Sequence, residues 1–230
     1  MTDRGLFITG TGTGVGKTYV AALIARGLRD AGRRVGVYKP VASGCEWREG
    51  RLVSLDAITL WEAAGRPGTL EQVCPQLFAA PLAPHLAARA ENRRVDTRLL
   101  LRGIEVWRAT CDFVIVEGAG GLMSPVSDED YNADLAAEMG FPLVVVAANE
   151  LGTINATMQT LIAADTYSKP LRIAGIVLNS PRTSNDDPSV ETNAAEITQR
   201  CRPPLLAEIP YAGTFNRPVD WDRVSTSRIG

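Results

Sequence analysis

The sequence predicts an α/β fold with a mostly parallel central sheet, because short apolar runs alternate along the chain with helical patterns. The runs are continuously apolar, which is typical of strands that are buried on both faces of a parallel sheet. The six expected strands cover residues 6–9, 35–38, 113–116, 143–147, 173–178 and 205–209. A chain of 230 residues with 45% hydrophobic and 22% charged residues suits one domain, so we expect a single domain over residues 1–230.

Helical patterns fill the intervals between these strands. We expect a helix over 17–31 to end at Gly32 and one over 133–139 to end at Gly140, because glycine commonly follows the last helical residue. The other expected helices cover residues 56–64, 96–110, 155–165 and 189–200. Residues 66–94 are rich in proline and carry no pattern that assigns them to a helix or a strand.

A glycine-rich loop, GTGTGVGKT from Gly10 to Thr18, lies between the first strand and the first helix. Glycines allow backbone N–H groups to converge on phosphate oxygens, and the start of a helix adds unpaired N–H donors. Thr11 occupies the position six residues before Lys17, where the strict phosphate-loop pattern has glycine. A surface turn is the structural alternative, but the flanking strand and helix favour a phosphate site and a three-layer fold like that of P-loop NTPases. The residues expected to hold the nucleotide phosphates are Gly14, Val15, Gly16, Lys17 and Thr18.

The rarity of lysine in this chain indicates that a second lysine, besides Lys17 of the loop, has a functional role. Only Lys17, Lys39 and Lys169 are lysines among 24 basic residues. An ammonium is a compact charge that can follow a moving phosphoryl group, which the planar arginine fork does less well. Lys39 is therefore a candidate for chemistry, with a chance surface lysine as the alternative, whereas Lys169 precedes a proline in an expected loop.

Polar or glycine-rich sequence follows each of the last five expected strands, where ligands of parallel sheets bind. Glu117 ends an apolar strand, a position where nucleotide enzymes place an acid to hold Mg²⁺ or its water. The alternative for Glu117 is a turn or capping hydrogen bond. For Asp56, which opens a helical pattern, the alternative is an N-cap or an acid in the first turn of the helix. Together with the Thr18 hydroxyl, the two carboxylates suit a hard cation that touches ATP phosphates.

Composition excludes several classes of function. The net charge is −2, so no bulk electrostatic attraction indicates nucleic acid or an anionic membrane as a partner. No apolar run approaches the ~18 residues of a membrane span, and the chain runs from MTDRG straight into the first strand, so we expect neither a membrane segment nor a signal peptide, and a cytoplasmic protein. The four scattered cysteines indicate reduced thiols, and with one histidine in the chain a metal cluster is not expected.

Several motifs together resemble the dethiobiotin synthetase family. They are GTGTGVGKT, YKPVASG at 38–44, SLD at 54–56, FAAP at 78–81 with Pro84-His85, VEGAGG at 116–121, LGTIN at 151–155 and EIPY at 208–211. Their order and spacing agree with the family to about Arg217, and YKPVASG and VEGAGG are more specific than the phosphate loop.

The resemblance implies a ring closure in biotin biosynthesis. CO₂ and one amine of 7,8-diaminononanoate form a carbamate, MgATP phosphorylates it, and the second amine closes the ureido ring of dethiobiotin with release of ADP and phosphate. Such chemistry depends mostly on positioning and charge neutralisation.

The resemblance also implies roles for individual residues. It assigns Lys17, Lys39 and Thr13 to the reacting groups, and the Mg²⁺ site to Thr18, Asp56 and Glu117. It assigns the adenine to Asn179 and to Pro210, Tyr211 and Ala212. The substrate residues it implies are Ser43, Gly120, Leu151, Gly152, Thr153 and Asn155. In the family, the segment that matches 151–155 reaches the substrate of the other subunit of a homodimer.

Some positions depart from the family pattern. Gly12 replaces an acid that is often found there, and Ser180 follows Asn179 where aspartate is common. Residues 221–230 match no part of the pattern, and His85 is read as structural because the reaction needs no imidazole base.

Three other activities are compatible with the fold. A switch ATPase of the partitioning or cell-division type usually has an extra lysine where Gly12 stands. A cobyrinate-type amide ligase needs a glutaminase domain for which 230 residues leave no room. A small-molecule kinase would release a phosphorylated product. Whether CTP competes with ATP is open.

Overall fold

The computed structural model, which describes residues 2–183 and 186–226, is built on a six-stranded sheet with parallel pairing throughout. The spatial order is β2-β5-β1-β6-β7-β8. The strands are β1 (Gly5–Gly10), β2 (Val35–Tyr38), β5 (Phe113–Glu117), β6 (Leu143–Ala148), β7 (Ile173–Asn179) and β8 (Leu205–Ile209). All six strands lie where the sequence predicts them, and the α/β prediction is confirmed.

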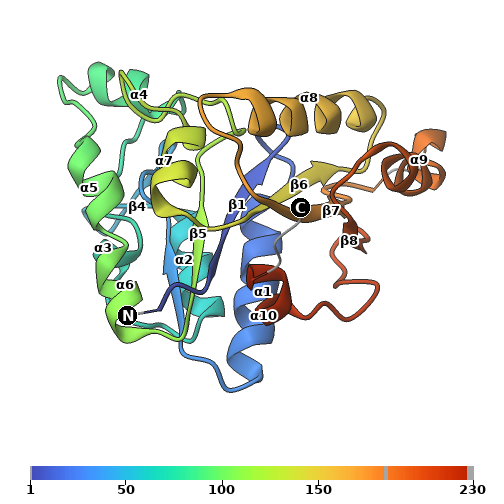
Figure 1. Ribbon diagram of the computed structural model, residues 1–230. Helices are drawn as coiled ribbons and strands as arrows, with labels where there is room; N and C mark the ends of the chain where they lie inside the picture. Colours follow the sequence, from blue (N-terminus) through green and yellow to red (C-terminus); the bar gives the residue numbers. More distant parts are fainter. Residues whose placement is uncertain (1, 184–185, 227–230) are drawn as a thin grey trace.

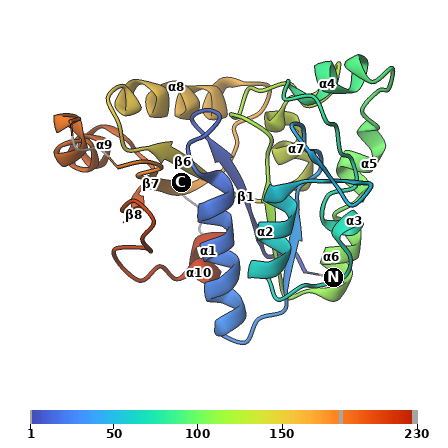
Figure 2. The same cartoon turned by 180° about the vertical axis from the view of Figure 1, so that it is seen from behind.

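Helices cover both faces of the sheet and complete a three-layer fold. One face carries α1 (Lys17–Asp30) and α2 (Leu55–Ala63), which lie nearest the viewer in Figure 2. The other face carries α7 (Asn132–Met139), α8 (Thr153–Thr166) and α9 (Asn193–Arg200), seen from the front in Figure 1. Every residue of β1, β2, β5 and β6 is buried, as the continuous apolar runs predict.

The helix expected over 96–110 is wrong as a single element. The structure has α5 (Thr97–Arg102) and α6 (Glu105–Thr110) instead. The Tyr38 hydroxyl donates to the carbonyls of Leu99 and Leu100 at 2.8 and 3.0 Å, and a Cβ on Gly103 would lie 2.3 Å from that hydroxyl. The break between α5 and α6 therefore accommodates a tyrosine side chain from β2.

Other boundaries also differ from the expectation. The helix expected over 189–200 consists of a short 3₁₀ segment, Pro188–Glu191, followed by α9. The proline-rich interval contains α3 (Leu70–Val73) and α4 (Pro84–Ala90). Two elements had no counterpart in the sequence analysis: the hairpin of β3 (Glu46–Arg48) and β4 (Arg51–Val53), and α10 (Trp221–Thr226).

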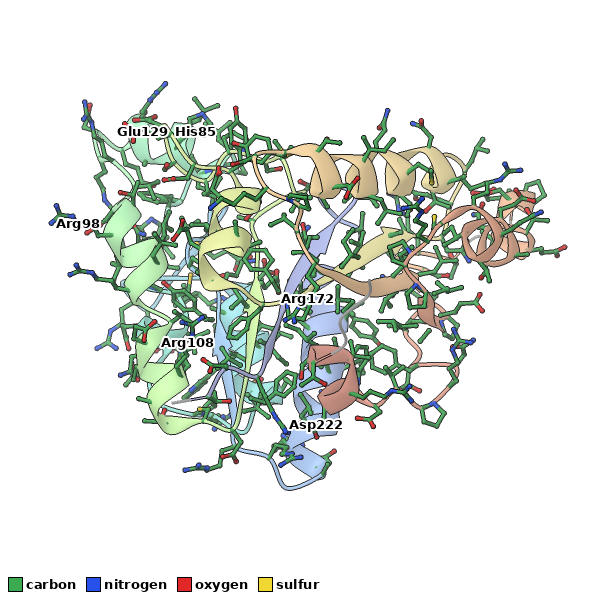
Figure 3. The ribbon with its side chains drawn as sticks, in the orientation of Figure 1. His85, Arg98, Arg108, Glu129, Arg172 and Asp222 are labelled. Atoms are coloured by element: carbon green, nitrogen blue, oxygen red, sulfur yellow. The ribbon has the colours of Figure 1, made fainter. Side chains whose placement is uncertain are left out.

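The described residues include no helix with the length and apolarity needed to cross a membrane. The four cysteines are free thiols, of which Cys45 and Cys74 are buried. The single histidine, His85, lies on α4, where Figure 3 labels it.

Candidate functional site

The glycine-rich loop connects β1 to α1 and turns back on itself. Gly14 and Gly16 have φ values of 78° and 92°, a left-handed conformation that favours glycine. A Cβ on Gly16 would lie 2.2 Å from the Asn179 side-chain nitrogen, so this position has no room for a larger residue. The Lys17 side chain curls back over the loop, and its Nζ donates to the Gly12 carbonyl at 2.8 Å.

A compact charged cluster lies beside the loop. Lys39 follows β2, and its Nζ lies 2.5 Å from Glu117 Oε1 and 2.8 Å from Asp56 Oδ2. The Thr18 hydroxyl, in the first turn of α1, donates to the same Glu117 oxygen at 2.8 Å. Four residues predicted to be functional, from α1, β2, α2 and β5, thus meet in one place. We call Thr18, Lys39, Asp56 and Glu117 the charged cluster.

The N-cap alternative for Asp56 is wrong, whereas Asp56 does stand in the first turn of α2, as the other half of that alternative expected. Ser54 is the N-cap of α2, and its side chain accepts the backbone N–H of Ala57. Asp56 is therefore free of the cap and turns its carboxylate toward Lys39.

Burial and charge shift the ionisation of this cluster. Burial lowers the pKa of Lys17 to about 8, with the nearby Lys39 ammonium acting in the same direction and Glu117 and Asp56 opposing it. The pKa of Lys39 is raised because the attraction of Glu117 and Asp56 outweighs the effect of burial. The pKa of Asp56 is lowered by Lys39, again against the effect of burial. Lys39 therefore keeps its proton and its positive charge firmly, whereas Lys17 loses its proton more easily than a free lysine does.

A cavity of about 500 Å³ opens over the loop and the charged cluster. Thr13, Ser43 and Gly120, which the sequence analysis associated with the reaction and the substrate, line it. His85 does not belong to its lining. The cavity brings two ammonium groups, two carboxylates, several hydroxyl groups and a phosphate-type loop around one volume, which suits the binding of two anions that must approach each other.

Asn132 holds the turn that follows Glu117 and is a residue that the sequence analysis missed. It is fully buried at the start of α7, and its side-chain nitrogen donates to the carbonyls of Ala119 and Gly121 at 2.7 and 2.8 Å. Its oxygen accepts the Ala119 N–H at 3.1 Å. These bonds shape the turn after Glu117. The sequence analysis expected the helix to begin one residue later, at 133, and the sequence does not show which distant backbone groups Asn132 binds.

The predicted adenine residues lie near the loop but outside the cavity lining. The Asn179 side chain donates to the Val15 carbonyl at 2.9 Å and joins the end of β7 to the phosphate loop. Pro210, Tyr211 and Ala212 follow β8, and Tyr211 is exposed. Tyr19, which the sequence analysis did not single out, donates its hydroxyl to the Gly213 carbonyl at 2.5 Å and connects α1 to this turn.

The segment at 151–155 does not reach the charged cluster within one chain. Leu151 is 82% exposed, Asn155 is also exposed, and neither lines the 500 Å³ cavity. Gly152 caps α8 in a left-handed conformation, with φ of 97°, and Thr153 is buried. The structure of the single chain thus leaves this helix start on the surface.

The charged cluster fits a Mg²⁺ ion by the chemistry of its donors. Thr18, Asp56 and Glu117 supply hard oxygen atoms, the ligand type that Mg²⁺ takes. Glu117 Oε2 is buried and has no hydrogen-bond partner among the described residues. A buried carboxylate oxygen without a partner is costly, and a cation would satisfy it.

Comparison with known proteins connects the chain to enzymes of one activity. A family model described as an AAA domain matches residues 4–219. The ATP-dependent dethiobiotin synthetase BioD of Rhodopirellula baltica is 45% identical over 214 residues, which cover 88% of this chain and 82% of the relative. The enzyme of the same name from Anaeromyxobacter dehalogenans strain 2CP-C is 47% identical over 209 residues, which cover 90% of each chain. That of Anoxybacillus flavithermus is 37% identical over 214 residues, which cover 93% of this chain and 94% of the relative.

Solved structures share the fold at low sequence identity. A ParA family ATPase from Chlorobium tepidum aligns with a TM-score of 0.56 and 18% identity, covering 91% of this chain and 85% of that one. The septum site-determining protein MinD of Pyrococcus horikoshii, solved with Mg-ADP, aligns with a TM-score of 0.53 and 20% identity, covering 90% and 81%. These likenesses confirm the P-loop NTPase-like fold.

Proposed function

This chain belongs to the ATP-dependent dethiobiotin synthetase family, and from that premise we propose that it closes the ureido ring of dethiobiotin from 7,8-diaminononanoate, CO₂ and ATP. The enzyme is an ATP-dependent ligase of biotin biosynthesis. The observation that carries the detailed reaction is the meeting of Lys17 and Lys39 beside Thr13 and Ser43 in one cavity. The two ammonium groups around one cavity reduce the repulsion between a carbamate and a triphosphate, two anions that the reaction brings together.

The reaction has three steps. One amine of the substrate forms a bond to the carbon of CO₂ and loses a proton, which gives a carbamate. A carbamate oxygen then attacks the γ-phosphorus of ATP, and ADP leaves. The second amine attacks the carbon of this mixed anhydride and loses a proton, and the carbon–oxygen bond to phosphate breaks, which leaves the cyclic urea and free phosphate.

Each residue near the cavity has a part in these steps. Lys17 holds the β- and γ-phosphates, and the loop residues Gly14, Val15 and Gly16 hold them through their backbone. Lys39 and Ser43 orient the carbamate, and Thr13 stands near the reacting groups. Gly120 leaves space for the diamine. Asn179, Pro210, Tyr211 and Ala212 hold the adenine. The bond from Asn179 to the loop residue Val15, and that from Tyr19 to Gly213, the residue after Ala212, support this role.

Thr18, Asp56 and Glu117 hold Mg²⁺ in this proposal. The ion, when bound with ATP, neutralises charge that develops on the phosphates during transfer. The partnerless oxygen of Glu117 supports this assignment.

The working enzyme is a cytoplasmic homodimer in this proposal, with each chain folded as one domain. Leu151 and Asn155 extend from the exposed start of α8 to the partner's diamine, and Gly152 and Thr153 present the N-terminus of the helix to its carboxylate. Leu151 is large, apolar and almost fully exposed, which favours a covering partner.

Phosphate release is expected to require MgATP, the diamine and dissolved CO₂ together. The acceptor is a carbamate, which exists only when an amine meets CO₂. In buffer stripped of CO₂, release should fall close to background, and bicarbonate should restore it. Labelled bicarbonate should end in the cyclic urea, as followed by mass spectrometry.

The same assay separates the alternatives. A switch ATPase hydrolyses ATP without the diamine, and a kinase works in CO₂-free buffer and accumulates a phosphorylated product. Diamine-dependent turnover without CO₂, or product without label, contradicts the proposed reaction and leaves the nucleotide site in place.

Mixed dimers provide a test of the shared site. Lys17→Ala and Asn155→Ala place their defects in different halves of the proposed composite site. When the two inactive proteins exchange subunits, one site of each mixed dimer combines two intact halves, so part of the activity should return. Activity is measured by phosphate release, and exchange by native mass spectrometry of differently tagged chains. No recovery after demonstrated exchange would mean that each site is built within one subunit.

A further inference from the structure

The Lys39 ammonium lies where a metal ion would need to bind. Its Nζ is 2.5 Å from Glu117 Oε1 and 2.8 Å from Asp56 Oδ2, and the Thr18 hydroxyl points to the same Glu117 oxygen. The ammonium thus contacts two of the three residues that the proposed function assigns to Mg²⁺, and the third, Thr18, bonds the same Glu117 oxygen. The Lys39 side chain is 5% exposed, so the ammonium has replaced its water shell with these oxygens.

A lysine ammonium and a divalent cation compete for such a set of oxygens. Like charges side by side in a poorly hydrated site repel strongly, and Mg²⁺ needs its ligands closer than an ammonium does. Glu117 is almost completely buried, so its charge requires a cation at all times. The ammonium contacts Oε1 of Glu117 and leaves Oε2 without a hydrogen-bond partner among the described residues, so a metal ion in its place would supply a partner that Lys39 does not.

We propose that Lys39 is the resident counter-ion of the metal-binding carboxylates, and that a divalent cation enters only together with nucleotide phosphates, which displaces the ammonium toward the carbamate. The proposal rests on the proposed function for the identity of the metal ligands. Phosphate oxygens complete the coordination of Mg²⁺ and so favour the exchange, which the free ion cannot achieve alone. The released ammonium is then close to the bound carbamate, whose negative charge replaces that of the carboxylates.

This exchange gives the site an order of assembly. Before the nucleotide arrives, the carboxylates and Lys39 neutralise each other, and the pocket offers little attraction to a carbamate. After MgATP arrives, the same lysine becomes available to the second substrate. One side chain thus serves two anionic partners in turn, which couples nucleotide binding to substrate binding.

Mn²⁺ is a suitable probe, because electron paramagnetic resonance counts the free ion without any turnover. The wild-type protein without nucleotide should bind Mn²⁺ weakly, and adding ADP should create one bound ion. Lys39→Met keeps the unbranched side chain as far as Cε and removes the ammonium. It should bind one Mn²⁺ without nucleotide, with an affinity that is higher than that of the wild type by on the order of tenfold or more.

Matched variants test whether Mn²⁺ binding is controlled by the positive charge at position 39 or by the loss of any positive charge from the pocket. Lys39→Arg keeps a cation beside the carboxylates and should exclude free Mn²⁺ as the wild type does. Lys17→Met removes a charge from the same pocket, but Lys17 donates to the Gly12 carbonyl and should leave Mn²⁺ binding much closer to wild type. The double variant Lys39→Met/Glu117→Gln has no buried charge to compensate and should lose the Mn²⁺ site again.

The outcomes are distinct. Equal nucleotide-free affinity of wild type and Lys39→Met for Mn²⁺, or no binding by Lys39→Met, overturns the proposal. If Lys39→Met is unstable, its melting temperature should rise with Mn²⁺ while that of the wild type stays unchanged, and equal responses again overturn it. Failure of the wild type to bind Mn²⁺ with ADP contradicts the proposed metal ligands, on which the proposal rests, whereas the Lys39→Met results test the exchange alone, so the two failures are distinguishable.

Discussion

Lys17→Ala is expected to abolish turnover and to leave the folded structure intact. Loss of one preorganised charge in a dry site lowers the rate by on the order of 10²–10³. Burial disfavours the charged form of Lys17, and the hydrogen bond that its Nζ donates among the described residues goes to the carbonyl of Gly12, so removing the side chain should not reduce stability. Phosphate release measures the effect, and the melting temperature reports the fold.

Lys169→Ala is the matched control for this experiment. Lys169 is exposed in the segment between α8 and β7, and its loss should leave the rate unchanged. A Lys17→Ala enzyme with a near wild-type kcat would remove Lys17 from the reaction.

Lys39→Arg is expected to fail nearly as completely as Lys39→Ala. Lys39 lies in a closely packed cluster with Asp56 and Glu117, and the planar guanidinium is wider than an ammonium. Misplacement of the carbamate against the γ-phosphate by about 1 Å costs roughly 10²-fold in rate. The measurement is kcat at saturating ATP and diamine, with circular dichroism as the control for folding.

The opposite result has a clear meaning. If Lys39→Arg keeps most of its activity, a general positive charge suffices at this position, and the carbamate-orienting role of Lys39 is withdrawn. Since arginine is expected to exclude free Mn²⁺ as lysine does, this variant also separates the two functions proposed for Lys39.

The sequence predicted the sheet well because its strands are buried on both faces and read as continuous apolar runs. It also located Lys17, Thr18, Lys39, Asp56 and Glu117, since each stands at the end of a strand or the start of a helix, where ligands of this fold bind. Their contacts in the structure do not test their roles, which remain predictions.

Features that depend on contacts between residues far apart in the chain could not be predicted from the sequence. The break between α5 and α6 accommodates the hydroxyl of Tyr38, which lies some sixty residues earlier in the chain, and no local sequence pattern predicts it. Asn132 escaped notice because its importance lies in the backbone groups that it binds, not in its neighbours along the chain. The β3–β4 hairpin is short and exposed, so it lacks the apolar alternation that identifies a half-buried strand.

The last helix suggests a practical way to attach this enzyme to a surface. Asp222 of α10 binds Arg4 before β1 and Arg33 after α1, and Figure 3 shows Asp222 on the side of the sheet away from α8. The Trp221 ring packs against Phe215, so the helix is anchored by apolar contact as well as by charge. Arg4 precedes β1 and Arg33 follows α1, whereas the phosphate loop follows β1 and precedes α1, so Asp222 lies at the end of the sheet opposite that loop. An enzyme immobilised through α10 should therefore present its cavity to the solution, open to nucleotide and diamine alike.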